Sequence, residues 1–140
     1  MIFIGFGFLM VFLKNNSWTS IGFNYLIAAW AIQITILFRG FWAQIGNYYF
    51  NKNHDWMKIN ISLYDLFNAD FGAAALLITF GAILGKCNIF QLWCIATIEM
   101  FIYTVNETII YDIWQVDDIG GSMTIHVFGA YFGVACALFY

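Results

Sequence analysis

The chain alternates long apolar segments with short polar ones. An α-helix needs about 20 mostly apolar residues to cross the hydrocarbon core of a membrane. The pattern predicts about five helices, over residues 1–13, 18–38, 66–85, 89–111 and 120–140. The first segment is short for a complete span, so we expect it to be one end of a truncated helix.

The polar connections predict how these helices are arranged. Three are short, at residues 14–17, 86–88 and 112–119, so neighbouring helices should be antiparallel; only the loop over 39–64 has room for further structure. Alternating spans place Lys14 and Lys86 on one side, which we interpret as cytoplasmic because basic residues favour that side. Of the sequons at Asn15, Asn60 and Asn106, only Asn60 falls in an outer loop, and its glycosylation stays open.

Composition supports a membrane protein and excludes several other classes. Hydrophobic residues make up 63% of the chain and charged residues 9%, whereas soluble domains carry about 25% charged residues. We therefore predict an all-α, polytopic integral membrane protein. The formal net charge of −3 gives no basic patch for nucleic acid. Three dispersed cysteines without metal-ligand spacing predict no disulfide, no metal site and no cofactor.

His126 is the most informative residue, because it lies inside the apolar segment 120–140. A titratable side chain at membrane depth is costly and usually marks a functional site. Helical periodicity predicts that the imidazole lies on a narrow stripe of small residues, because one face holds Ser122, His126, Gly129, Ala130 and Gly133. The alternative is a core histidine bonded to a backbone carbonyl.

Two glutamates fall within the predicted helix over 89–111. A carboxylate at membrane depth must be paired, protonated or hydrated. Glu99, near the middle of the span, is either a structural hydrogen-bond node or a functional group. Glu107, nearer the outer end, is either an ordinary interfacial carboxylate or part of a site.

Two aspartates lie at predicted helix starts, Asp70 and Asp118, where a carboxylate favours an N-cap. Next to Asp70, Phe71 heads a stripe of mostly small residues in the helix over 66–85, which continues with Ala74, Ala75, Ile78, Ala82 and Gly85. This stripe indicates either close helix packing, with Gly81-x-x-x-Gly85 in support, or the wall of a lumen with an aromatic plug.

Several of these segments resemble the Rhesus (Rh) branch of the ammonium transporter family. The most specific is residues 118–133, DIGGSMTIHVFGAYFG. Further matches occur in family order at 6–10 (FGFLM), 67–71 (FNADF), 80–86 (FGAILGK) and 105–107 (VNE). The resemblance covers about five of the family's eleven or twelve helices, which implies part of an inverted-repeat fold.

The resemblance implies a non-enzymatic channel for ammonium or ammonia in the plasma membrane, assembled as a homotrimer. It implies that Phe71 is half of an external gate and that His126 is one of two lumen histidines. It places Glu107 in an outer vestibule that enriches ammonium, and it assigns Asp118 to ammonium recruitment or deprotonation. The second histidine and the second gate aromatic would belong to the remaining helices of the full-length protein.

Two other functions stay open from the sequence. Some Rh-like proteins are non-conducting structural components of membrane complexes, and a gas channel for carbon dioxide is a further alternative. A single lumen histidine argues against a purely structural role. Five helices alone would not close a lumen that lies between two halves.

Overall fold

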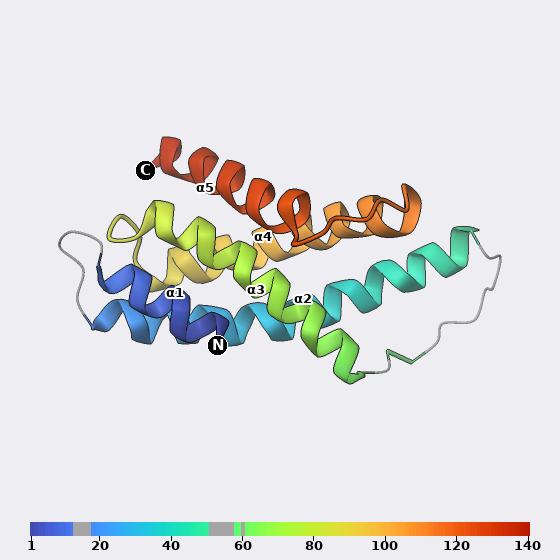
Figure 1. Ribbon diagram of the computed structural model, residues 1–140, viewed down its shortest axis with the longest axis horizontal. Helices are drawn as coiled ribbons and strands as arrows, with labels where there is room; N and C mark the ends of the chain where they lie inside the picture. The colour runs from blue at the N-terminus through green and yellow to red at the C-terminus, as the bar shows by residue number, and fades with distance from the viewer. Residues whose placement is uncertain (13–17, 51–57, 60) are drawn as a thin grey trace.

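The computed structural model describes residues 1–12, 18–50, 58–59 and 61–140, and the described residues contain helices and no strand (Figure 1). The structure confirms the all-α class predicted from the sequence. Its elements, in chain order, are α1 (Ile2–Val11), α2 (Thr19–Phe50), α3 (Leu63–Ile83), α4 (Ile89–Thr108), the π-helical segments η1 (Ile109–Ile113) and η2 (Ser122–Val127), and α5 (Phe128–Phe139).

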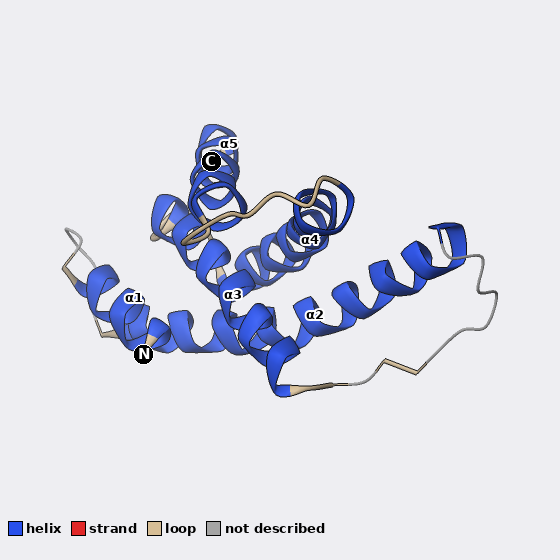
Figure 2. Ribbon diagram, turned by 45° about the vertical axis from the view of Figure 1, so that its right-hand side comes forward, coloured by secondary structure: helices blue, strands red, loops and turns tan. Residues whose placement is uncertain are grey.

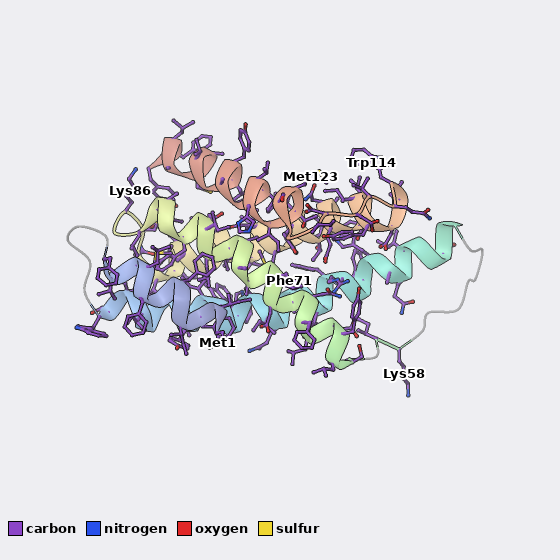
Figure 3. The ribbon with its side chains drawn as sticks, in the orientation of Figure 1. Met1, Lys58, Phe71, Lys86, Trp114 and Met123 are labelled. Carbon is purple, nitrogen blue, oxygen red and sulfur yellow. The ribbon has the colours of Figure 1, made fainter. Side chains whose placement is uncertain are left out.

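Four helical segments of the described chain are long and apolar enough to cross a membrane: Thr19–Gly46, Leu63–Ile83, Ile89–Ile113 and Ser122–Phe139. The turn containing Lys86 and the C-terminus lie at one end of the molecule, and Lys58 and Trp114 lie at the other (Figures 1 and 3). This arrangement agrees with antiparallel spans. Lys14, Asn15 and Asn60 lie outside the described residues, so their expected positions stay predictions.

The predicted end of the second helix at residue 38 is wrong, because α2 continues to Phe50. Phe38 and Trp42 both pack against Phe101 of α4, with ring centroids 5.3 and 5.4 Å apart. These contacts continue the buried face of α2 past Arg39, so the first part of the predicted loop is helical.

The third helix begins three residues before the expected residue 66. The helix α3 begins at Leu63 with a capping box, in which Ser62 accepts from the backbone of Asp65 and the Asp65 side chain accepts from the backbone of Ser62. Asp70 is therefore inside α3 and is not its N-cap. Gly85 follows the helix end in a left-handed conformation, with φ of +79°.

The helix α3 is central in the molecule, since it packs against α2 on one side and against α5 on another (Figure 2). Its buried residues are mainly small or aliphatic, so its neighbours approach closely. The buried members of α3 are Ala69, Gly72, Ala73, Ala74, Ala75, Leu76, Leu77, Thr79, Phe80 and Ile83.

Backbone-to-backbone contact joins α5 to α3. A Cβ atom at Gly129 would lie 2.6 Å from the carbonyl oxygen of Ala75, and one at Gly133 would lie 3.1 Å from Cα of Thr79. The pair Gly129 and Gly133 is therefore a helix-packing motif.

The other glycine pair is not such a motif. Gly81 faces the side chain of Met10 in α1, whereas Gly85 lies outside the helix with nothing within 4 Å of its Cβ position. The predicted packing role of Gly81-x-x-x-Gly85 is wrong because Gly85 serves the turn after α3.

We expect Gly129→Leu and Gly133→Leu to lower the yield of monodisperse protein in detergent and to lower its unfolding temperature. Forcing a side chain into a packed contact typically costs about 1–3 kcal/mol, and here the nearest atoms belong to the α3 backbone. Ala135→Leu is the matched control, because Ala135 of α5 is exposed. Wild-type yield and unfolding temperature for both glycine variants would contradict the packing role.

Candidate functional site

Asp118 holds the turn that leads into η2. Its Oδ2 atom accepts hydrogen bonds from the Met123 amide at 3.0 Å, the Thr124 amide at 2.8 Å and the Thr124 hydroxyl at 2.9 Å. Gly120 and Gly121 bring the carboxylate to these donors through left-handed conformations, with φ of +79° and +68°. The N-cap residue of η2 is Gly121, so Asp118 is not the N-cap itself, but its side chain caps the helix by accepting hydrogen bonds from free amides at the helix start.

Capping also sets the charge state of Asp118. Partial burial opposes ionisation, but the hydrogen bonds from Thr124 and Met123 outweigh it and hold the pKa of the Asp118 carboxyl below its usual value. Hydrogen bonds to a carboxylate stabilise the charged form. Asp118 therefore carries a negative charge at neutral pH, at the start of the segment that contains His126.

A wide turn separates Asp118 from His126. The carbonyl oxygen of Gly121 accepts from the amides of both Ile125, at 2.9 Å, and His126, at 3.0 Å. The second bond spans five residues, which defines the π-helical geometry of η2. A π turn changes the angle between the residues before it and those after it.

This turn overturns the predicted single face of small residues around the histidine. Gly129 and Gly133 are buried against α3, whereas Ser122 and His126 are exposed. The alternative of a core histidine bonded to a backbone carbonyl stays a prediction, because it depends on helices outside this chain. His126 lies on a surface of the described chain that its other helices do not cover.

Phe71 is similarly placed, since 46% of its surface is exposed in α3. Two members of its predicted stripe lie against α5: a Cβ atom at Gly129 would be 3.1 Å from Cβ of Ile78, and one at Gly133 would be 3.1 Å from Cβ of Ala82. The close-packing interpretation is thus confirmed for Ile78 and Ala82. Phe71 is free to face another part of the protein.

Glu107 is buried, with 6% of its surface exposed, and its Oε2 atom lies 3.1 Å from Nε of Arg39 in α2. An interfacial, solvated carboxylate was one of the two sequence interpretations, and it is wrong. Arg39 Nη1 is also buried, and it has no hydrogen-bond partner among the described residues. Glu107 Oε2 also lacks a hydrogen-bond partner among these residues, so a buried carboxylate is paired with a partly exposed guanidinium, and both keep hydrogen-bonding capacity.

A cavity of about 270 Å³ adjoins this ion pair. Tyr111 lines it, and the Tyr111 hydroxyl lies 3.3 Å from Oγ1 of Thr124, the residue that also donates to Asp118. Tyr111 therefore connects the Arg39–Glu107 region with the Asp118 turn. The other lining residues are Ile36, Arg39, Gly40, Ala43, Gln44, Lys58, Ile59, Asp65, Glu107, Thr108 and Asp112.

Sequence reasoning missed Arg39, Tyr111 and Thr124. Arg39 was assigned to a loop, although Phe38, Trp42 and Ile45 keep helical spacing around it. Thr124 follows Asp118 within one local turn, so its capping contact could have been foreseen. The contact of Tyr111 with Thr124 depends on how η1 and η2 meet, and no local pattern predicts it.

Comparison with known proteins identifies relatives over nearly the whole chain. The Ammonium Transporter Family matches residues 1–140. Ammonium transporter Rh type B of Xenopus tropicalis is 48% identical over 134 residues, which are 96% of this chain and 27% of that protein. The Rh type B proteins of Danio rerio and Bos taurus are 46% and 45% identical over 96% of this chain, covering 27% and 28% of their own lengths. The chain therefore spans just over a quarter of these relatives.

We expect Asp118→Ala to destabilise the protein by about 1 kcal/mol, the usual effect of losing an N-cap, and Asp118→Asn to destabilise it less because an amide oxygen still accepts. Since the folded-state pKa is lowered, the wild-type advantage is present above the unfolded pKa of about 3.9. It disappears as pH falls through the folded pKa. Thermal unfolding in detergent from about pH 7 to about pH 3 measures it. The exposed neighbour supplies the control, Asp117→Ala; equal effects of the two alanine variants would refute the cap.

We expect Arg39→Ala to destabilise the protein by about 3–5 kcal/mol, because it leaves the buried Glu107 carboxylate without its counter-charge. The double variant Arg39→Leu, Glu107→Leu should recover most of this loss, since it removes the buried carboxylate together with its counter-charge. Lys58→Ala, at an exposed cation lining the same cavity, is the control. Chemical unfolding of the three variants measures the effect, and an Arg39→Ala protein as stable as Lys58→Ala would contradict a buried pair.

Proposed function

Because the chain belongs to the Rh branch of the ammonium transporter family, we propose that the complete protein conducts ammonia across the membrane after recruiting and deprotonating ammonium. The observation that carries this proposal is the short turn joining two functional candidates. Asp118 caps η2, and η2 presents an exposed His126. A charged acceptor thus precedes the imidazole by eight residues, across the turn that leads into η2.

Recruitment requires a negative charge that a cation can sense. Glu107 is paired with Arg39, so its charge is largely neutralised within the protein. Asp118 stays ionised because its helix-start amides and the Thr124 hydroxyl stabilise the charge. We therefore assign recruitment mainly to Asp118, with Glu107 and Arg39 shaping the adjoining vestibule.

Passage then depends on the cost of moving charge into an apolar path. An isolated ammonium ion is expensive to desolvate, whereas neutral ammonia is not. A gate at Phe71 is the place where ammonium would lose its proton, and His126 would meet ammonia beyond it. A neutral imidazole offers one donor and one acceptor, which suits a molecule that both donates and accepts hydrogen bonds.

The exposure of Phe71 and His126 in this chain supports a path that further helices complete. We propose that the remaining helices of the full-length protein cover these residues, that the assembled protein is a homotrimer, and that it resides in the plasma membrane. A lumen built between two halves explains why polar and aromatic site residues lie on an uncovered face.

We expect Asp118→Ala to reduce methylammonium uptake by at least about tenfold and His126→Ala to reduce or alter it, because the first residue acts before the lumen and the second within it. The assay is uptake by vesicles carrying the protein from its complete natural reading frame, scored per inserted copy. Tyr131→Phe, on the exposed side of α5, is the control. Wild-type uptake by both alanine variants would overturn the proposal, and loss of expression with normal uptake per copy would make His126 a packing residue.

A further inference from the structure

A second acid lies away from this site, where α3, α4 and α5 meet. Glu99 of α4 has 0% of its surface exposed. Oγ1 of Thr79 in α3 lies 2.6 Å from Oε1 of Glu99 and 3.0 Å from the carbonyl oxygen of Gly129 in α5. The Oε2 atom of Glu99 is buried without a hydrogen-bond partner among the described residues. One threonine hydroxyl therefore connects three helices.

Among the residues that the structure describes, no cation is paired with Glu99. The ion pair found in the described part of the chain joins Arg39 to Glu107, and the described lysines, Lys58 and Lys86, are exposed. The titratable group that faces Glu99 from α5 is the thiol of Cys136. An unpaired carboxylate in a dry interior costs several kcal/mol, whereas a neutral acid needs only hydrogen bonds.

The number of protons available for these two hydrogen bonds also indicates that Glu99 is protonated. A threonine hydroxyl carries one proton, yet both contacts of Thr79 are with oxygen atoms. If Glu99 were a carboxylate, one of the two oxygens would receive no proton. If Glu99 is protonated, its hydroxyl donates to Thr79, and the Thr79 hydroxyl donates to Gly129. A separation of 2.6 Å is typical of a strong O–H···O bond.

The carbonyl oxygen of Gly129 is reachable only because this position lacks a side chain. A Cβ atom there would lie 2.6 Å from the backbone of Ala75. Gly129 follows His126 by three residues, and η2 begins only seven residues before it. The axial shift and the rotation of α5 relative to α3 at Gly129 therefore fix the position of His126.

We propose that Glu99 is a protonated acid that donates to Thr79, and that this relay through Thr79 to Gly129 positions the turn carrying His126. Glu99 and Thr79 are thus positioning residues, and they do not contact the permeating species. The consequence for transport rests on the proposed function. The assignment of the proton does not, since it follows from buried hydrogen bonds alone.

The first test is spectroscopic and uses the protein from the complete reading frame. We expect the infrared spectrum at neutral pH to contain the carbonyl band of a protonated carboxylic acid that is lost in Glu99→Gln. The same band should shift in Thr79→Val, because the acid loses its acceptor, and stay in place in Thr79→Ser. Absence of the band in wild type, or its survival in Glu99→Gln, would overturn the assignment of the proton.

The second test separates a neutral donor from a charge. Glutamine keeps an N–H donor for Thr79, so Glu99→Gln and Thr79→Ser should retain methylammonium uptake within about twofold. Glu99→Leu and Thr79→Val break the relay and should lower the maximal rate roughly fivefold to tenfold, with little change in KM. The double variant Glu99→Leu, Thr79→Val should be no worse than either single variant, because both break the same relay.

Each outcome decides a separate point. Equal losses in Glu99→Gln and Glu99→Leu would show that the charge matters, and would overturn the proposal. Wild-type uptake by Thr79→Val and Glu99→Leu would overturn the positioning role. If Glu99→Leu does not fold, the Thr79 pair and the infrared band still decide. If wild type carries no methylammonium, the proposed function fails while the infrared result still settles the proton.

Discussion

The rest of this structure depends on how closely the backbone of α5 lies against α3. Gly129 and Gly133 leave no room for side chains, since a Cβ atom at Gly129 would be 2.6 Å from the Ala75 carbonyl oxygen. In a membrane, such contacts replace the hydrophobic effect as the main force between helices. With α5 fixed in this way, Thr79 can reach Gly129, and the side of η2 that carries His126 stays uncovered.

Three acids in this apolar chain are each stabilised by a different interaction. Arg39 neutralises Glu107 across α2 and α4, helix-start amides stabilise Asp118, and Thr79 bonds to Glu99. Each of these interactions prevents an isolated charge from lying in a medium of low dielectric constant. Asp118 alone of these acids combines a retained charge with partial exposure. It accepts a hydrogen bond from Thr124, whose hydroxyl also contacts the cavity-lining Tyr111, so its charge lies near the cavity.

The exposed apolar surfaces of this chain indicate what surrounds it in the membrane. Phe71 of α3 and His126 of η2 are both exposed, and α5 also exposes Tyr131, Val134 and Leu138. Apolar exposure of this extent suits contact with lipid or with other helices. The chain spans about 27% of the length of its Rh type B relatives. Both facts agree with a site whose second wall is supplied by helices outside this chain.

The sequence alone determined the class of the protein and its local features. Hydrophobic segment lengths predicted membrane-crossing helices, and the cap at Asp118 followed from residues within two turns, because such signals need only neighbours along the chain. The contacts between residues far apart in the sequence were decided by the tertiary structure. Packing on Phe101 extended α2, Arg39 met Glu107, and Thr79 joined Glu99 to Gly129. The π turn at Gly121 set the face of His126, and a uniform helical period could not predict it because that period assumes an unbroken α-helix.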